Sequence, residues 1–390
     1  MITRLELSNF TSFGEFAIDF SPKINVIIGE NGSGKTHLLK AAYGLCAGAP
    51  LYKDKPDATK DELKAVLTQK LVRLFMPLDE SLGRLRRNDA KTPARLAARF
   101  ASGAEVSGTF NVGSKSLKVK EGALYRENLG VATFIPTKEV LSLVKGMTDP
   151  IHDERTVELI FDAGYVDLAE ALMRQTTDDP DDKVNQDPRF AAIVPSLVNL
   201  IGGRYRLENG GFCFQAGEYI EKVPTKGSTS KAGQAFKDAV WEFRASTSKS
   251  LSSGMTAEGF RKIGVLYRLL SNGTLDPGKS GPLFWDEPES NLNPRLMKQL
   301  VEVLLELSRN GQQIILATHD YVLLKWFDLL MDKGKSDHVR FHALYRDPEH
   351  VGVMVDSVED YRSLSPNAIS ETFNDLTKEQ VNRKMGGLGK

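Results

Sequence analysis

The feature that most constrains the fold of this 390-residue chain is a short glycine-rich stretch near its N-terminus. Residues 29–36 read GENGSGKT and match the pattern G-x-x-x-x-G-K-[ST]. The apolar run at 24–28 predicts a strand before this stretch, and the spacing of leucine and alanine over 37–45 predicts a helix after it. A glycine-rich turn with a chance lysine is the alternative. The order strand, loop, helix favours a phosphate-binding loop in an α/β sheet.

This loop has the residue types that a bound polyphosphate requires. Its glycines allow the backbone to curl so that N–H groups face an anion, and the following helix adds the positive end of its dipole. We expect Lys35 to reach the β- and γ-phosphates and the Thr36 hydroxyl to bind Mg²⁺. The candidate nucleotide-binding residues of the loop are Gly29, Glu30, Asn31, Gly32, Ser33, Gly34, Lys35 and Thr36.

A second candidate functional motif lies far along the chain at 283–287, where LFWDE predicts an apolar strand that ends in two carboxylates. Such pairs are commonly only solvated. Beside a phosphate loop, however, Asp286 could hold Mg²⁺ through water, and Glu287 could polarise the water that attacks a γ-phosphate. We therefore predict that Asp286 is a metal-site residue and that Glu287 is catalytic.

His319 follows another apolar run, 313–318, which predicts a further buried strand. Ligands in α/β sheets gather at the carboxyl ends of the strands, so Gly29, Asp286 and His319 are expected along one edge. A lone histidine is usually structural. At this edge, His319 could instead sense the γ-phosphate and help to organise the attacking water.

The stretch LSSGM at 251–255 precedes a predicted helix over 256–270. A serine hydroxyl and free backbone N–H groups at a helix start can face an anion. Read alone, the stretch is only a Ser-Gly helix cap. In combination with the other motifs, it makes Ser252 and Gly254 candidate nucleotide-binding residues.

Hydrophobic patterning divides the chain into three predicted segments. We expect a first lobe at 1–147 with the phosphate loop and a helical insertion at about 55–97, a mainly helical insertion with a β-hairpin at 148–235, and a second lobe at 236–390. Local expectations are strands at 4–10 and 15–20 around a turn at Gly14, an end to the regular pattern at 47–50, a capping box at Thr59, hairpins over 106–119 and 205–214, an acidic loop at 176–182 and a polar loop at 226–234.

Composition and charge exclude some partners and leave others open. Lysine plus arginine and aspartate plus glutamate both number 51, so no net charge draws the whole chain to nucleic acid or anionic lipid. The basic run at 84–99 predicts a solvated helical face, with a phosphate-backbone contact as the alternative. No apolar run is long enough to span a membrane, and the N-terminus lacks a signal-peptide region. Cys46 and Cys213 have no metal-type spacing, so we expect free thiols. Together with the lack of a membrane-spanning run, this leads us to expect a cytoplasmic location and no membrane partner.

The motifs follow the order phosphate loop, LSSGM, WDEP and ATHD, which resembles the order in ABC-type ATPases. The start LSNFTSF at 7–13 and the long gap before the Asp-Glu strand look like soluble SMC/RecF/OLD-like ATPases. The stretches FIPTKE at 134–139 and FWDEPESNLNP at 284–294 look like a bacterial subgroup often found beside effector genes in phage-defence loci. The implied fold is α/β: an ABC-type P-loop NTPase head with a mixed central sheet, antiparallel β elements and an inserted helical subdomain.

This resemblance implies an ATPase in which two heads sandwich two molecules of ATP with Mg²⁺. Each head would use its own Lys35, Glu287 and His319 in catalysis, with Ser252 and Gly254 supplied by the partner. The implied protein is a homodimer or a higher homo-oligomer that controls a separate effector, a nuclease or toxin, in anti-phage defence. A RecF-like DNA repair or chromosome ATPase that binds DNA and a transporter ATPase subunit are the alternatives.

The sequence departs from the family pattern at several positions. Ser253 stands where the family commonly has glycine, and Met255 stands where it often has glutamine. No glutamine follows the strand predicted over 131–136; Lys138 or Glu139 is nearest, so no residue is assigned to the Mg²⁺-sensing position of the family. The middle of the chain is also too short for a long coiled coil and has no sustained heptads.

Overall fold

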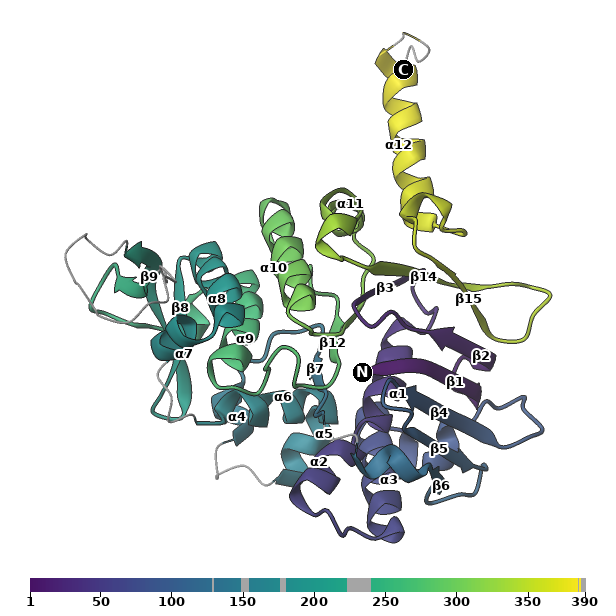
Figure 1. Cartoon of the computed structure of the whole chain (residues 1–390). Coiled ribbons are helices and arrows are strands. Elements are labelled where there is room, and N and C mark those ends of the chain that lie inside the picture. Colours follow the sequence, from purple (N-terminus) through teal and green to yellow (C-terminus); the bar gives the residue numbers. More distant parts are fainter. Residues whose placement is uncertain (128–129, 149–153, 176–179, 223–239, 385, 387–390) are drawn as a thin grey trace.

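The computed structural model describes residues 1–127, 130–148, 154–175, 180–222, 240–384 and 386. Its centre is a sheet in the order β15-β14-β3-β13-β12-β7, in which only β15 runs antiparallel to its neighbour. These strands are β3 (Ile24–Gly29), β7 (Thr133–Ile135), β12 (Leu283–Asp286), β13 (Ile314–Ala317), β14 (Val339–Arg346) and β15 (Val353–Val358). Because β3 lies between β13 and β14, both ends of the sequence build one sheet (Figure 1).

Alternate side chains of the central strands enter two cores, one on each face of the sheet. In β12, Leu283 and Trp285 belong to one core and Phe284 to the other. In β13, Leu316 and Ile315 divide in the same way. Successive side chains of a strand point to opposite faces, so a parallel sheet covered on both sides needs a continuous apolar run. This requirement explains why these strands could be recognised from the sequence.

Helices cover both faces of the central sheet (Figure 1). On one face α1 (Lys35–Leu45) contacts β3, β12 and β13, while α3 (Lys60–Phe75) packs on α1 and α2 (Gly48–Asp54) packs on α3. The helices on the other face are α9 (Glu258–Ser271), α10 (Met297–Arg309) and α11 (Tyr321–Leu330). The predicted capping box is confirmed, since the Thr59 side chain accepts the Glu62 backbone N–H and the Glu62 carboxylate accepts the Thr59 backbone N–H. The end of regular structure predicted at 47–50 is wrong. Pro50 is accommodated because it lies in the first turn of α2, where its missing N–H costs nothing.

A separate antiparallel sheet has the order β2-β1-β4-β5-β6. Its strands are β1 (Ile2–Phe10), β2 (Phe13–Asp19), β4 (Ala94–Phe100), β5 (Glu105–Phe110) and β6 (Lys118–Glu121). The strands predicted at 4–10 and 15–20 and the hairpin over 106–119 are confirmed. The turn predicted at Gly14 is displaced, because Gly14 lies within β2 and the chain turns at Thr11, which has a φ of 49°.

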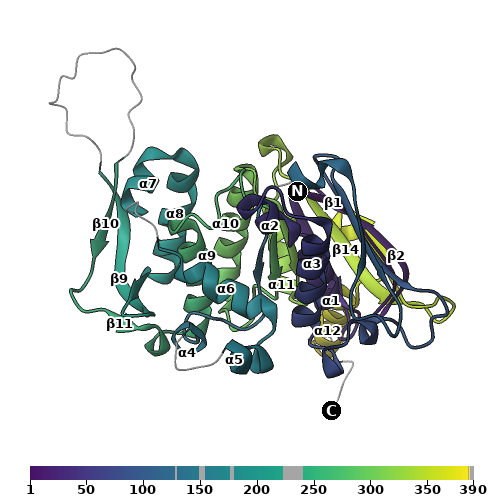
Figure 2. The same cartoon turned by 90° about the horizontal axis from the view of Figure 1, so that it is seen from below.

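The insertion between the two halves lies at the end of the molecule away from that sheet (Figure 2). Its elements are α4 (Val144–Thr148), α5 (Glu154–Ile160), α6 (Ala163–Met173), α7 (Pro180–Gln186), α8 (Pro188–Ile201), β8 (Gly203–Glu208), β9 (Gly211–Lys222), β10 (Val240–Ala245) and β11 (Leu251–Ser252). The hairpin predicted over 205–214 is confirmed. It turns at Asn209 and Gly210, whose φ angles of 51° and 74° suit a two-residue hairpin loop.

Two predictions about connecting segments are wrong or only partly tested. The helical insertion expected at about 55–97 ends with α3, after which 78–85 form short 3-10 turns and 94–100 form β4. Leu96 and Ala98 alternate with outward arginines there, so the basic run is not a helical face. The acidic loop is interrupted because α7 begins at Pro180. Residues 176–179 and the polar loop at 226–234 lie outside the described residues.

The C-terminal helix α12 (Ala368–Lys384) extends away from the body of the molecule (Figure 1). None of its side chains is buried in the described structure. Within the described ranges, no helix combines the length and apolar character that crossing a membrane requires.

Candidate functional site

The predicted phosphate loop joins β3 to α1 through backbone conformations that favour glycine. Gly32 and Gly34 have φ angles of 78° and 92°. A side chain on Gly34 would approach Ser12 Oγ to 2.7 Å and the Phe13 ring to 3.0 Å. Glycine is therefore required at position 34 for both conformation and space. Because α1 begins at Lys35, the positive end of its dipole lies directly at the loop.

Lys35 is buried beneath the loop, with 8% of its surface exposed. Its Nζ donates to the carbonyl oxygens of Gly29 at 2.7 Å and Glu30 at 3.2 Å. Burial lowers the pKa of Lys35, whereas the nearby carboxylates of Glu287 and Asp286 act to raise it. A phosphate would favour the charged ammonium and offer a stronger acceptor than either carbonyl.

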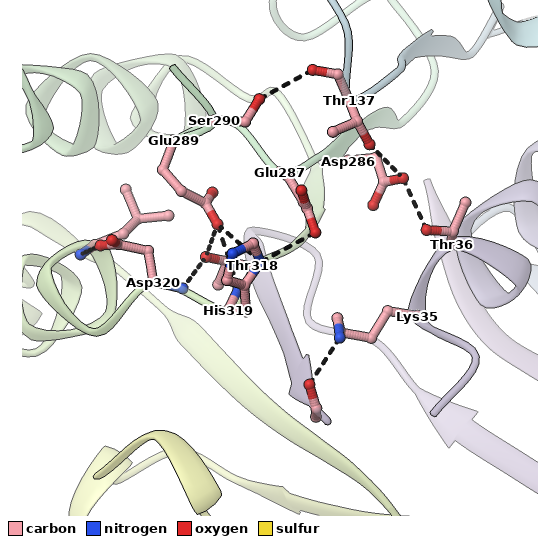
Figure 3. A network of polar contacts seen from close by, with 12 residues as sticks. Lys35, Thr36, Thr137, Asp286, Glu287, Glu289, Ser290, Thr318, His319 and Asp320 are labelled. Atoms are coloured by element: carbon pink, nitrogen blue, oxygen red, sulfur yellow. Dashed lines mark hydrogen bonds and ion pairs between the residues drawn. The ribbon is translucent and has the colours of Figure 1, made fainter. Parts of the chain in front are cut away.

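Asp286 is the point at which the loop meets the Asp-Glu strand. Its Oδ2 accepts hydrogen bonds from Thr36 Oγ1 at 2.8 Å and from Thr137 Oγ1 at 3.0 Å (Figure 3). Its Oδ1 is buried and has no hydrogen-bond partner among the described residues. Burial raises the pKa of Asp286, and the two threonine hydroxyls oppose that rise. The structure therefore brings the two predicted metal-site residues together and leaves one carboxylate oxygen available.

Thr137 was not identified from the sequence. It follows β7, which pairs in parallel with β12 so that Ile135 lies opposite Trp285. Lys138 and Glu139 were the nearest candidates for the position that glutamine occupies in the family. Glu139 instead pairs with Arg261 at 2.9 Å, away from Asp286. The available signal was a hydroxyl two residues after a strand expected to lie beside the Asp-Glu strand.

Glu287 and His319 meet at the same edge of the sheet. The Oε1 of Glu287 lies 3.0 Å from Nδ1 of His319 (Figure 3). Glu287 has a φ of 50°, and its backbone N–H donates to the Ala317 carbonyl at 2.9 Å. A non-glycine residue in this region of φ is uncommon, and such conformations cluster at functional sites.

Glu289 lies behind that pair and is buried. Its Oε1 accepts the Thr318 hydroxyl at 2.6 Å and the His319 backbone N–H at 3.3 Å. Burial raises the pKa of Glu289, and its bond from Thr318 opposes the rise. These bonds fix the backbone that presents His319 to Glu287. The role of Glu289 was missed because a third carboxylate after a strand looks like an ordinary solvated side chain in the sequence.

A buried lysine on α9 connects the Asp-Glu loop to the segment after β7. Lys262 Nζ donates to the Thr137 carbonyl at 2.7 Å and also to the Glu287 carbonyl and the Ser290 hydroxyl. Only 1% of its surface is exposed, and burial lowers the pKa of Lys262 to about 8 against the opposing effect of Glu289 and its neighbours. Its contacts hold Thr137 and Glu287 in a common frame.

The LSSGM stretch is not part of this chain's own phosphate site. In Figure 2, β11 lies beside β9 and is well separated from α1. Ser252 and Gly254 are exposed, and a side chain added to Gly254 would meet nothing within 4 Å. Ser253 is buried and donates to the Leu141 carbonyl at 3.3 Å, which explains a serine there. The structure thus brings Lys35, Thr36, Asp286, Glu287 and His319 together and leaves Ser252 and Gly254 apart.

Two family models match separate parts of the chain. Residues 4–111 match a family described as "AAA domain". Residues 170–325 match one described as "AAA domain, putative AbiEii toxin, Type IV TA system". Among solved structures, an SMC head bound to the C-winged helix domain of ScpA has a TM-score of 0.50 and 15% identity, over 93% of this chain and 98% of that one. Two parts of the chain are thus similar to AAA domains, and its fold is similar to that of an SMC head. The predicted α/β head with mixed and antiparallel sheets is confirmed.

Curated relatives of this head include DNA replication and repair proteins RecF. The protein from Limosilactobacillus fermentum is 30% identical over 161 residues, which is 41% of this chain and 37% of the relative. The protein from Idiomarina loihiensis is 57% identical over 47 residues, 12% of this chain and 13% of the relative. The chain therefore spans little more than a third of the first of these relatives and less of the second.

Proposed function

We propose that this head binds ATP with Mg²⁺ and hydrolyses it. The observation that carries the proposal is the hydrogen bond between Thr36 and Asp286, which joins the phosphate loop to the end of β12. Two segments 250 residues apart converge on one carboxylate whose other oxygen has no described partner. This arrangement supports a cation site beside a phosphate-binding loop.

The residues around Asp286 fit a magnesium ion. Hydroxyl and carboxylate oxygens are the hard ligands that Mg²⁺ binds, and it usually retains several waters. Thr36 and Asp286 would hold it, with Thr137 orienting the carboxylate. The ion would neutralise charge on the phosphate oxygens. Lys35 would add a fixed positive charge on the opposite side of the polyphosphate.

Glu287 is suited to orient the attacking water. It is 26% exposed by side chain, so its carboxylate reaches the open side of the site, and His319 fixes one of its oxygens. A carboxylate can accept a proton from water within hydrogen-bond reach of the reacting phosphate. His319 would therefore position the catalytic carboxylate and face the γ-phosphate.

Two variants separate binding from hydrolysis. Lys35→Ala should lose ATP binding, because the charge on the β- and γ-phosphates is removed. Glu287→Gln should retain ATP binding and hydrolyse it at least roughly tenfold more slowly, because the amide keeps the shape but not the basicity. Binding is measured by calorimetry and hydrolysis by phosphate release. Normal turnover in Glu287→Gln would falsify the catalytic assignment.

We further propose that two heads form the complete site. Ser252 and Gly254 are exposed in the segment that precedes α9, and β11, which contains Ser252, lies apart from α1, the helix that follows the phosphate loop. In a two-fold dimer they would face the γ-phosphate held by the other copy. Ser252→Arg should leave nucleotide binding by the monomer unchanged and abolish both ATP-dependent dimerisation and turnover. Normal hydrolysis by Ser252→Arg would show that the stretch is only a helix cap.

We propose that the head controls a separate effector in anti-phage defence. Within the described ranges, no group of three or more His, Cys, Asp or Glu side chains could hold a metal ion, so no second metal-dependent centre is seen there. A γ-phosphate shared by two heads also gives a two-state element that hydrolysis resets. The defence context itself comes from family resemblance.

The test compares the protein alone with the protein and its genomic neighbour, each as wild type and Glu287→Gln. We expect complex formation and toxicity or nuclease activity only with the neighbour present. Robust cleavage of DNA or RNA by the single chain, abolished by a mutation outside the ATP site, would contradict the proposal.

The RecF relatives support a function on DNA, whereas the ion pairs made by arginines of the basic run at 84–99 argue against it. Arg95 pairs with Glu6 at 2.9 Å, and Arg99 pairs with Glu105 at 3.0 Å. Arg87 pairs with Asp89 at 2.6 Å. These arginines already face carboxylates, which weakens them as phosphate ligands. Salt-dependent DNA binding would favour the RecF-like alternative.

A further inference from the structure

A cavity of about 460 Å³ opens beside the phosphate loop. Its walls come from four parts of the chain that are far apart in sequence: residues 28–33 at the loop, His319, the end of β14 at 344–346, and residues 366–373, where α12 begins. The cavity therefore extends from His319 to β14 and α12. Cavities of this size that combine apolar walls with a few polar groups are typical binding sites for small molecules. None of the roles proposed above uses the β14 and α12 walls.

The order of the strands gives this cavity a place along the nucleotide. Asp286 and Glu287 follow β12 and would act at the γ-phosphate. β13 separates β12 from β3, and β14 lies on the far side of β3. A nucleotide whose γ-phosphate faces β12 and whose phosphates cross the loop therefore directs its nucleoside toward β14, where the cavity lies.

The apolar wall of the cavity is held in place by α11. Phe373 stacks on Tyr321 with ring centres 4.1 Å apart and planes 13° from parallel. Phe373 is nevertheless 40% exposed, and Ile369 one turn earlier is half-buried. Both line the cavity. An aromatic and an aliphatic side chain on one wall suit the flat face of a base.

Polar groups also line the cavity. Ser33 is only 4% exposed, and its Oγ has no hydrogen-bond partner in the described part of the chain. Arg346 also lines the cavity and donates from Nη2 to the Gly32 carbonyl at 3.3 Å. A hydroxyl and a guanidinium are suited to sugar hydroxyls and to the α-phosphate.

We propose that this cavity binds the nucleoside part of ATP, with Ile369 and Phe373 of α12 against the base. The inference rests on the proposed function, because it takes the γ-phosphate end of the site as given. It gives the C-terminal helix a role in ligand binding. Base contact would also provide α12 with burial that the described structure lacks.

The test compares ATP with inorganic triphosphate, which has no base. Full-length wild type, Ile369→Ala and Phe373→Ala are titrated with each ligand and Mg²⁺ by calorimetry. Leu376→Ala is the matched control, since Leu376 lies on the same helix, is 55% exposed and does not line the cavity. We expect both cavity variants to lose about tenfold or more in ATP affinity and to bind inorganic triphosphate as wild type does.

A photolabel locates the base directly. After irradiation with 8-azido-ATP and digestion with trypsin, the label is expected on the peptides 341–346 and 363–378. Label on the peptide 5–23, which contains the turn between β1 and β2, together with unchanged ATP affinity in both cavity variants, would overturn the proposal. Absence of ATP binding by wild type would instead contradict the proposed function itself.

Discussion

Replacing Thr137 by valine removes one hydroxyl from Asp286 while keeping the shape of the side chain. Thr36 still donates to the same oxygen, so Asp286 retains one of its two bonds. A hydrogen bond to a charged group contributes roughly 1.5–3 kcal/mol. Because that bond favours the carboxylate, its loss should raise the pKa of Asp286 further above its usual range.

This change in pKa has a defined effect on Mg²⁺ binding. The ion needs the ionised carboxylate, so protons compete with it as the pH falls. The midpoint at which Mg²⁺ affinity is lost should therefore move upward by about one to two pH units in Thr137→Val. The assay is Mg²⁺ titration of the ATP complex between about pH 5 and pH 8 by calorimetry.

Thr133→Val is the matched control, because Thr133 is a buried threonine of β7 that lies four residues before Thr137. It should leave the midpoint at the wild-type pH. An unchanged midpoint in Thr137→Val, or an equal shift in both variants, would refute the role assigned to the hydroxyl.

Two further perturbations test the frame around the site. For Lys262, whose pKa is lowered to about 8 by burial, the unfolded chain binds more protons between about pH 8 and pH 10.5. The free energy of unfolding of wild type relative to Lys262→Met, measured with urea, should therefore rise by about 3 kcal/mol across that range, and a flat difference would contradict the burial. Asp162→Asn leaves Lys40, whose side chain is 16% exposed, without its 2.7 Å carboxylate partner. We expect a loss of about 2–4 kcal/mol in unfolding free energy with ATP affinity retained, and loss of ATP binding at full stability would argue otherwise.

Much of the site was predictable because its elements have strong local signals. The phosphate loop needs glycines at positive φ, and β12 and β13 need continuous apolar residues because both of their faces are buried. These two signals made it possible to identify Lys35 in the loop and Asp286 and His319 at the ends of the strands. The edge at which they meet followed from the rule for carboxyl ends of parallel strands.

The missed features depend on pairing between distant segments. Thr137 reaches Asp286 only because β7 pairs with β12. The residue types near position 137 do not indicate which strand β7 pairs with. Lys262 looked like a polar position on a helix, yet tertiary packing buries it against two carbonyls. The basic run was assigned to a helix because its charges obscured the two-residue alternation of Leu96 and Ala98 in β4.

Mixing two inactive variants tests most directly whether ATP is hydrolysed in a site shared by two heads. In a hybrid of Ser252→Arg and Lys35→Ala, one site combines an intact phosphate loop with an intact LSSGM stretch, and the other is doubly impaired. Because neither variant is expected to dimerise with itself on ATP, every ATP-dependent dimer in the mixture is a hybrid with one working site in two, and turnover per dimer should recover to about half of wild type. A mixture that stays at the mean of the two parent variants, although mass photometry shows hybrid dimers, would contradict the shared site.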